Sequence, residues 1–348
     1  MNAPPSLQLF PSALVVNVSR SLGDDSRCAV THVCASLGAA LRVFNRPNVR
    51  FQLLSALSES VTVAQSGVEI GGVSPSSAVL WSCPAGASCV KIDSPGVGTV
   101  TLTNLVFSGR AASASHATLP SQPLVISRLF ALALRAVTFR DFAPLLPLPR
   151  LAQTSSASLV QLVRLTDVAL VNVSTAQPAL EFRGAQSVSV DGLLVDTLLG
   201  GPALSVSAAQ QVTIARVAAT DVIAGNPGAA AGLLVLSDVQ SAQLSAFMVD
   251  TCVGPAQGQA SCVAIDSVQR LSLARLAFVG VSSVASGAAV RVSNSAQVAV
   301  TQLSCTVCAT TAGSGGALWL ENVAAASLTE LDFAQCSAAV RSRRSSRL

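Results

Sequence analysis

Residues 316–333 read GALWLENVAAASLTELDF, and this stretch determines the fold class. Leu318 and Leu320 alternate with other side chains, a polar turn at Glu321-Asn322 follows, and two further alternating apolar pairs come after it. Alternation with a period of two is typical of β-strands, in which successive side chains point to opposite faces. We therefore expect this stretch to form short strands with one buried face.

The same frame recurs upstream, which gives nine copies in all and indicates a repeat protein. The fourth apolar position of each copy is expected to point inward and to form one file along the molecule. It is occupied by Leu102, Leu134, Leu170, Val190, Ile214, Leu244, Leu273, Val300 and Leu328. These positions lie 20 to 36 residues apart, so loops of variable length are expected at one corner of each coil. Because a single coil cannot bury its apolar face alone, stacked coils about 4.8 Å apart are required. The sequence predicts an all-β protein, a right-handed parallel β-helix of about ten coils.

The turn after the first strand of the repeat has its own pattern. Its second residue is Asp238, Ser267, Asn294 and Asn322 in four of the last five copies. Asn and Asp tolerate the left-handed backbone conformation and bond their own backbone. Asn294 and Asn322 fall on adjacent coils, so we expect their amides to bond one another as an asparagine ladder, with a structural role.

The end regions differ from the repeat. Residues Cys34–Phe44 place Leu37, Leu41 and Phe44 on one side of a short helix, which we expect to cap the solenoid because end strands have unpaired backbone groups. No matching cap follows Phe333. We therefore expect the last coil to be an open edge through which copies of the chain can associate.

These features divide the chain into three parts. We assign residues 1–47 to an N-terminal segment with the helical cap, residues 48–336 to the β-helix, and residues 337–348 to a disordered Arg/Ser tail.

Nine cysteines are many for a protein of a reducing compartment. Three pairs bracket short segments: Cys28 and Cys34, Cys83 and Cys89, and Cys252 and Cys262. Structural disulfides are expected among the cysteines, with their connectivity left open. Cys308 and Cys336 take the same position in adjacent coils, a separation that a disulfide can bridge, whereas Cys305 takes an inward position and is expected to be a buried thiol. Cys305-Thr-Val-Cys308 also matches a CxxC motif. A redox site would need it at a helix N-terminus and a zinc site would need two further ligands, so no metal and no cofactor are predicted.

Two stretches carry a family resemblance. Gly315-Gly316-Ala317-Leu318, with Phe333 three residues before Cys336, resembles the repeat of chlamydial polymorphic outer-membrane proteins, in which Asn stands where this chain has Cys. Val68-Glu-Ile-Gly-Gly and the segment 100–107 resemble the opening coils of pectin-lyase-like proteins. The resemblance implies adhesion, surface display or contact with polysaccharides.

Composition excludes other classes of partner. Charged residues make up 11% of the chain, the net charge is +4, and aromatic residues make up 4% with no Tyr. A nucleic-acid surface would combine clustered basic residues with stacking aromatic residues, and neither pattern is present in the sequence. No apolar run approaches the roughly 20 residues of a membrane-spanning helix. The chain is therefore not expected to bind nucleic acid or to contain a transmembrane helix.

Catalytic residues are harder to find than the fold. The polygalacturonase segments Gly-His-Gly and Arg-x-Lys are absent from the sequence. Asp196 and Asp250 take the same position two coils apart, roughly 10 Å by strand spacing, and Asp221 lies one residue off that position in the coil between them. Inverting glycosidases space their carboxylates almost as widely, but Asp next to Thr also starts turns.

The sequence thus favours a non-catalytic extracellular or cell-surface module for adhesion or for binding a glycan or another surface protein. The alternative is a polysaccharide lyase or glycoside hydrolase of the pectin-lyase-like fold. No catalytic residue and no ligand-binding residue is assigned.

Overall fold

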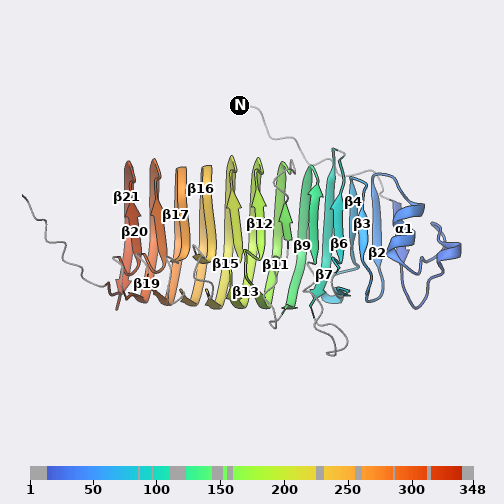
Figure 1. Ribbon diagram of the computed structural model, residues 1–348, viewed down its shortest axis with the longest axis horizontal. Helices are drawn as coiled ribbons and strands as arrows, with labels where there is room; N and C mark the ends of the chain where they lie inside the picture. Colours follow the sequence, from blue (N-terminus) through green and yellow to red (C-terminus); the bar gives the residue numbers. More distant parts are fainter. Residues whose placement is uncertain are drawn as a thin grey trace, which may run out of the picture.

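The computed structural model describes residues 14–84, 87–95, 97–109, 123–142, 152–154, 160–224, 231–254, 261–284, 287–311 and 315–338. The described strands are stacked in one elongated solenoid (Figure 1), and every pairing between named strands is parallel. The chain is a right-handed parallel β-helix, as predicted. It makes about eight turns, slightly fewer than the ten expected.

The strands form three faces, and the chain passes through them in the order C, A, B within each coil. Face A contains β1 (Leu14–Val18), β2 (Val49–Leu53), β4 (Val68–Gly72) and the first parts of β7 (Thr99–Ser108), β9 (Ala131–Phe142), β11 (Leu162–Thr175), β13 (Ser187–Gly200), β15 (Gln211–Ile223), β19 (Gln297–Thr310) and β21 (Ala325–Ala334). Face B contains β5 (Val79–Ser82) and the second parts of β7, β9, β11, β13, β15, β19 and β21.

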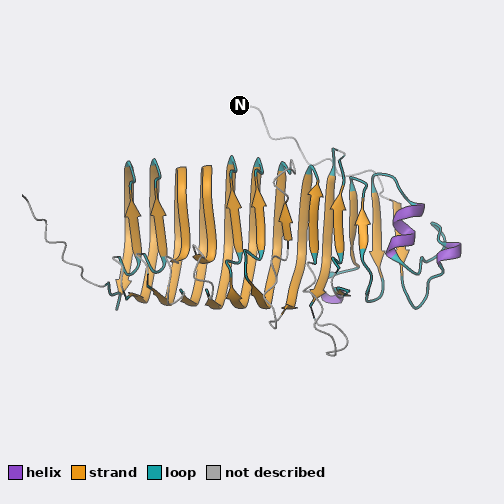
Figure 2. Cartoon of the chain, viewed as in Figure 1, coloured by secondary structure: helices purple, strands orange, loops and turns teal. Residues whose placement is uncertain are grey.

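Face C contains β3 (Val61–Val63), β6 (Val90–Asp93), β8 (Leu124–Arg128), β10 (Ala152–Thr154), β12 (Leu180–Arg183), β14 (Leu204–Ser207), β18 (Val290–Ser293) and β20 (Leu318–Glu321). Two long strands, β16 (Ala231–Val253) and β17 (Ser261–Ser283), pass through all three faces. Figure 2 shows how little of the chain is helical: α1 (Leu37–Val43) and two short 3-10 turns, Asp25–Arg27 and Pro75–Ser77.

The core is a set of inward-facing files of aliphatic side chains. Eight of the nine residues predicted for the central file lie in it, since each pairs in register with the next. Leu170 does not: it is buried, but it pairs with Phe139 and Val195 on face B, and Leu165 takes its place in the file. The error arose because the residues between β10 and β11 lengthen that coil. With Leu165, consecutive members lie 24 to 32 residues apart, which is more regular than predicted.

Stacked aromatic side chains fill part of the core in the N-terminal half. Trp81 stacks on Phe107 with ring centroids 5.6 Å apart, and Phe107 stacks on Phe139 at 5.3 Å. All three side chains are fully buried and lie in one file of face B. Coils are thus fixed in register by ring stacking as well as by their backbone ladders.

Residues with left-handed backbone conformation make two of the solenoid's corners. At the corner between faces C and A, Asp238, Ser267, Asn294 and Asn322 have φ of 51° to 56°. The side-chain amide of Asn322 donates to Oδ1 of Asn294 at 3.0 Å, which confirms the predicted ladder. Left-handed residues also stack at the corner between faces A and B, for example Ala246 and Arg275. Others, for example Thr251 and Val307, make a bend within face B.

The ladder ends on a carboxylate. Asp266 Oδ1 accepts hydrogen bonds from Ser293 Oγ at 2.6 Å and from Asn294 Nδ2 at 2.8 Å, and Oδ2 accepts one from Ser267 Oγ at 2.9 Å. Burial works to raise the pKa of Asp266, but these hydrogen bonds and the nearby Arg291 outweigh it and lower the pKa.

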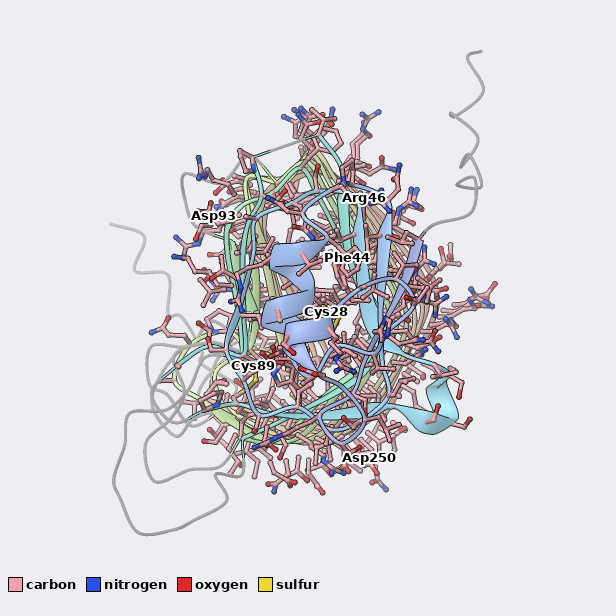
Figure 3. All side chains as sticks on the ribbon, turned by 90° about the vertical axis from the view of Figure 1, so that its right-hand side faces the viewer. Cys28, Phe44, Arg46, Cys89, Asp93 and Asp250 are labelled. Atoms are coloured by element: carbon pink, nitrogen blue, oxygen red, sulfur yellow. A yellow bond between two sulfur atoms is a disulfide. The ribbon has the colours of Figure 1, made fainter. Side chains whose placement is uncertain are left out.

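The N-terminal end is covered as predicted. Helix α1 begins after Ser36, whose hydroxyl caps the backbone N–H of Ala39, and it buries Leu37, Leu41 and Phe44 against the solenoid. Figure 3, which views the molecule along its long axis, shows α1 lying across the end of the coil. Strand β1, which the sequence did not predict, pairs with β2 beneath this cap, so the sheet begins within residues 1–47.

The C-terminal end shows the opposite arrangement. Leu328 and Phe333 point into the files of Val300 and Cys305, yet they are 42% and 43% exposed, whereas the latter two are 1% exposed. The last coil is therefore an exposed edge among the residues that the structure describes. Ser337 still pairs with Ala309, and most of the tail assigned to 337–348 lies outside the described residues.

The structure settles the cysteine pairing that the sequence left open, and it differs from expectation at Cys305. Disulfides join Cys28 to Cys34, Cys83 to Cys89 and Cys252 to Cys262. Cys305 is buried as predicted, but it is not a thiol: it is bonded to Cys308, and Cys336 is the free cysteine. The prediction was wrong because the left-handed backbone of Val307 turns Cys308 inward beside Cys305.

Candidate functional site

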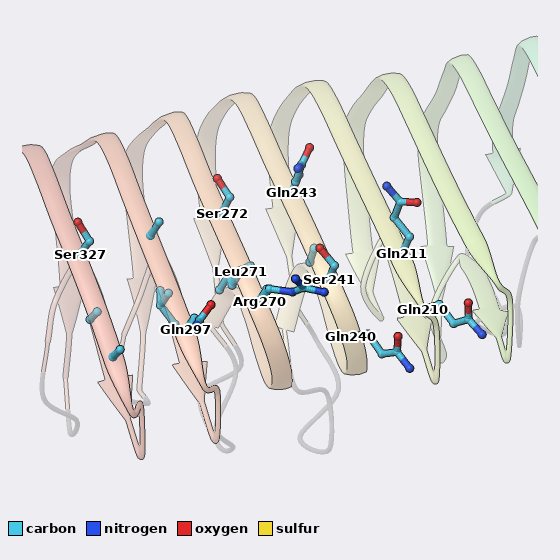
Figure 4. A pocket seen from close by; sticks show the side chains of 15 residues that line it. Gln210, Gln211, Gln240, Ser241, Gln243, Arg270, Leu271, Ser272, Gln297 and Ser327 are labelled. Carbon is cyan, nitrogen blue, oxygen red and sulfur yellow. The ribbon is translucent and has the colours of Figure 1, made fainter. Parts of the chain in front are cut away.

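A long shallow groove crosses the outer surface of face A. It spans the face A strands of five consecutive coils, from β15 to β21, and has a volume of about 870 Å³. Its polar lining comes from neutral side chains with one exception, as Figure 4 shows: Gln210, Gln211, Gln240, Ser241, Gln243, Arg270, Ser272, Gln297 and Ser327. Because outward positions recur in every coil, the groove runs along the solenoid axis.

Strand register arranges these side chains in rows. Gln211, Ser241, Arg270 and Gln297 occupy one outward position on four successive coils, and Gln243 and Ser272 are neighbours in a parallel row. Successive members are about one strand spacing, 4.8 Å, apart. Arg270 extends toward Ser241 on the neighbouring strand (Figure 4). The groove therefore offers a repeated array of amide, hydroxyl and guanidinium groups that donate and accept hydrogen bonds.

Charged groups at the corner between faces A and B bond one another. Arg216, at the corner between faces A and B, donates from Nε to Asp191 Oδ1 at 2.5 Å and from Nη2 to Asp167 Oδ1 at 3.3 Å. The hydrogen bond from Arg216 lowers the pKa of Asp191, and the same bond raises the pKa of Arg216. Gly192 lies between them with φ of 82°, where an added Cβ would be 2.5 Å from Asp167 Oδ1. These ion pairs stabilise the corner between faces A and B. Among the residues that line the groove on face A, Arg270 alone is charged.

The three acidic residues singled out in the sequence lie on face B, away from the groove. Asp196 and Asp250 occupy one outward position two coils apart with Thr220 between them, as predicted, and Asp221 follows Thr220. All three carboxylates are exposed. In Figure 3, Asp250 lies at the periphery of the coil.

Two of their hydrogen bonds are local to a turn, and a third joins neighbouring coils. Asp196 Oδ1 accepts from Thr197 Oγ1 at 3.4 Å and from Thr220 Oγ1 at 3.2 Å, and Asp250 Oδ1 accepts from Thr251 Oγ1 at 3.4 Å. Thr197, Asp221 and Thr251 all have left-handed backbone conformation, which makes the bend within face B. The structure thus brings the acids into one ridge, and none of the three lines the groove on face A.

A second, smaller hollow lies at the corner between faces A and B. It has a volume of about 510 Å³ and is lined mainly by apolar groups, including Met248, whose side chain is 70% exposed, with Arg275 and Glu330 beside it. Asp250 lies two residues beyond Met248 on β16 but does not line the hollow. No sequence signal marked this place.

Metal ligands converge at one place in the part of the chain that the structure describes. The sulfur atoms of Cys305, Cys308 and Cys336 all lie within 4.8 Å of one another, and two of them form a disulfide. The sequence analysis assigned neither a metal nor a cofactor. Among the described residues, no helix is long and apolar enough to cross a membrane.

The groove was not predicted from the sequence, because each of its residues, taken alone, is an ordinary surface residue. A usable signal did exist: Gln161, Gln186, Gln210 and Gln240 recur at the start of face A on four successive coils. Stacking an outward file of amides builds a surface that no single repeat contains.

Comparisons with known proteins add the following. No protein-family model matches the chain, and no curated protein matches it. Among solved structures, the chain is similar to the GH136 lacto-N-biosidase from Eubacterium ramulus, at 9% identity over 92% of this chain and 67% of that chain, with a TM-score of 0.45. It is also similar to the catalytic domain of a GH87 α-1,3-glucanase in complex with nigerose, at 11% identity over 95% and 70% of the two chains, with a TM-score of 0.37.

Similarities with TM-scores below 0.5 carry no information on the function of this chain. What the strand register establishes is the fold: the chain is a right-handed parallel β-helix, the fold of pectin-lyase-like proteins.

Proposed function

We propose that the chain is an extracellular or cell-surface β-helix that binds an extended neutral glycan along the groove on face A. The observation that carries the proposal is the groove's array of outward Gln and Ser side chains, repeated coil by coil over five coils. Amide and hydroxyl groups make hydrogen bonds in both directions, which is what sugar hydroxyls require. A glycan is itself a repeating polymer, so it suits a surface that repeats along one axis.

The charge of the groove favours a neutral ligand over an acidic one. Arg270 is the single charged side chain in the lining. An acidic polysaccharide would gain one ion pair, which at an exposed position contributes little. Four disulfides in the described chain support an extracellular or surface location, because disulfides persist in oxidising compartments.

The test is a binding measurement on neutral and acidic oligosaccharides by calorimetry, with variants in the groove. Gln243→Ala and Arg270→Ala each remove groups that face the ligand. Each is expected to weaken binding about three- to tenfold, the effect of losing one hydrogen bond of about 0.5–1.5 kcal/mol. The double variant is expected to abolish measurable binding of a weak ligand.

Gln161→Ala is the matched control, because Gln161 occupies the same outward row two coils before Gln210 and lies outside the groove. It should bind as the parent does. The proposal is wrong if no neutral oligosaccharide binds, or if Gln161→Ala weakens binding as much as Gln243→Ala.

Glycoside hydrolysis is the second candidate, and one observation favours it. Asp196 and Asp250 share an outward position two coils apart, roughly 10 Å by strand spacing, near the wider carboxylate separations of inverting glycosidases. Against it, acid–base chemistry needs groups tuned and held against a bound substrate, and these carboxylates lie on an exposed ridge. We therefore expect no lyase or glycosidase activity.

Cleavage of acidic and neutral glycans, with and without calcium, tests this expectation for the parent and for Asp221→Ala. Absence of product in both supports a binding module. Activity that is present in the parent and lost in a folded Asp221→Ala variant would make the ridge on face B the active site.

A further inference from the structure

Three cysteines meet where the last two coils stack. Cys308 pairs in register with Val281 of the coil before, and the next residue, Ala309, pairs with Ser337 of the coil after. Cys336 therefore lies directly beside Cys308, one strand spacing away, and Ser337 N–H donates to the carbonyl oxygen of Cys308 at 2.8 Å. A Cα separation of about 4.8 Å is within the range that a disulfide bridges.

Cys308 is already bonded to Cys305 within its own coil, across a Cα separation of 6.1 Å. The third sulfur, that of Cys336, carries a thiol and lies within 4.8 Å of both. Its Sγ donates to the carbonyl oxygen of Cys305 at 3.2 Å, which holds it over the disulfide. Cys308 thus has two possible partners at bonding range, one in its own coil and one in the next.

We propose that Cys308 is shared between two disulfides and that Cys336 exchanges with Cys305 for it, so that the last coil can be locked onto the solenoid covalently. In the exchange, the Cys336 thiolate attacks Sγ of Cys308 and forms the Cys308–Cys336 bond. The Cys305–Cys308 bond breaks, and its electron pair leaves on Sγ of Cys305, which takes up the proton that Cys336 released. One disulfide and one thiol exist before and after, so no oxidant or reductant is consumed.

The location makes this exchange asymmetric. Cys305 and Cys308 are 1% and 0% exposed, and Cys336 is half-buried in the coil whose inward side chains are partly in solvent. The nucleophile therefore belongs to the most exposed coil, and the disulfide it attacks belongs to the packed one. When the last coil docks, the exchange is possible; when it frays, Cys336 moves away and Cys305–Cys308 persists.

The two disulfides have different structural effects. Cys305–Cys308 closes a tight loop within one strand, β19, and links no coils. Cys308–Cys336 would join β19 to the end of the last coil and so oppose its detachment. Whatever stacks on the last coil and keeps it docked would favour the second disulfide.

Peptide mapping tests the proposal on the whole chain. The native protein is acid-quenched, then denatured in excess N-ethylmaleimide and digested without reduction by trypsin and a glutamate-specific protease. Cleavage after Arg291, Glu321, Glu330 and Arg341 separates Cys305 and Cys308 from Cys336. We expect a mixture: one form with Cys336 labelled, and one with Cys305 labelled and the two peptides joined through Cys308 and Cys336.

Single variants make the result decisive. Cys305→Ser should contain the joined peptides and no label at this cluster, and Cys308→Ser, which removes the shared sulfur, should be labelled at both Cys305 and Cys336. The pairs Cys28–Cys34, Cys83–Cys89 and Cys252–Cys262 serve as internal controls and should stay intact. A native chain labelled at Cys336 alone, together with free Cys308 and Cys336 in Cys305→Ser, would overturn the proposal, as would a Cys305–Cys336 bond in Cys308→Ser.

A second measurement tests the lock itself. Amide hydrogen exchange over β21 should be slower in Cys305→Ser, where the lock forms, than in Cys336→Ser, where it cannot, by roughly tenfold. Equal exchange rates in the two variants would show that the bond does not hold the last coil.

Discussion

The two ends of this solenoid carry the same kind of inward side chain and bury it differently. At the N-terminal end, Val16 and Val18 of the outermost strand are fully buried under α1. At the C-terminal end, Leu328 and Phe333 occupy core files and are more than 40% exposed. The alternation of apolar residues therefore sets the direction of a side chain, while the neighbouring element decides whether that side chain leaves water. The stability of such a fold therefore comes mainly from the interfaces between neighbouring coils and less from each coil alone.

A charge placed in the central file should give the largest difference between positions. Ile214→Asp buries a carboxylate between two packed coils, where it has no partner, and we expect it to cost more than about 4 kcal/mol in the free energy of unfolding. Leu328→Asp, in the same file at the exposed end, should cost less than about 1 kcal/mol. Urea unfolding of both variants measures the contrast. Similar costs would mean that the last coil is covered in solution.

Amide hydrogen exchange rates should differ between the two ends in the unmutated protein. We expect amides of residues 318–333 to exchange at least about a hundredfold faster than those of the central strands, because they open locally. Amides of β2, beneath the cap, should resemble the central strands. If exchange over 318–333 slows as protein concentration rises, in step with a larger mass by light scattering, the exposed coil is where copies associate. Protection in a monomer equal to that of the central coils would contradict the open edge.

The carboxylate of Asp266 should give a smaller, pH-dependent effect confined to the C-terminal coils. Its pKa is lowered in the folded chain, so its stabilising contribution is present above the unfolded-state pKa of about 3.9 and is lost as the pH falls through the folded-state pKa. Asp266→Asn should therefore destabilise by about 1 kcal/mol at pH 7 and by much less once the pH is below the lowered folded-state pKa. Denaturation of both proteins at the two pH values checks the sign. A difference that grows in acid would refute it.

Removing one hydrogen bond of the asparagine ladder without adding strain, as Gly does at position 322, should give the smallest effect. Asn322→Ala removes the hydrogen bond to Asn294 and places Ala at φ of 52°, whereas Asn322→Gly removes the bond alone. We expect faster exchange over residues 318–333 in both, by about threefold in the Gly variant and about tenfold in the Ala variant. Equal rates in the two variants would mean that the left-handed corner carries no strain for Ala.

The fold could be predicted from the sequence because burial in a β-helix is periodic at two levels, along each strand and from coil to coil. The prediction of the central file failed where the spacing between faces C and A changes. Because the connection before β11 is longer than in other coils, Leu170 was placed in the file that belongs to Leu165. The cap was predictable because an amphipathic helix carries its own pattern.

The candidate site was less predictable for a physical reason. Outward residues such as Gln211 and Arg270 become neighbours only after the coils stack, and nothing in one repeat constrains them. The Cys305–Cys308 bond was missed because alternation predicts the direction of side chains in a strand but not a left-handed residue, Val307, inside it. By contrast, the Asp196–Asp250 relation followed from strand spacing and was placed correctly.

Parallel pairing throughout the described solenoid has a mechanical consequence. The ladder bonds point along the long axis, so a pull on the two ends loads them one coil at a time, and the described solenoid should unravel coil by coil from its exposed C-terminal coil. Since consecutive members of the central file lie 24 to 32 residues apart, each detached coil would lengthen the chain by roughly 80 to 110 Å at about 3.3–3.6 Å per extended residue. Stretched between two surfaces, such a protein would yield in steps at nearly constant force, and a bond from Cys308 to Cys336 would delay the first step.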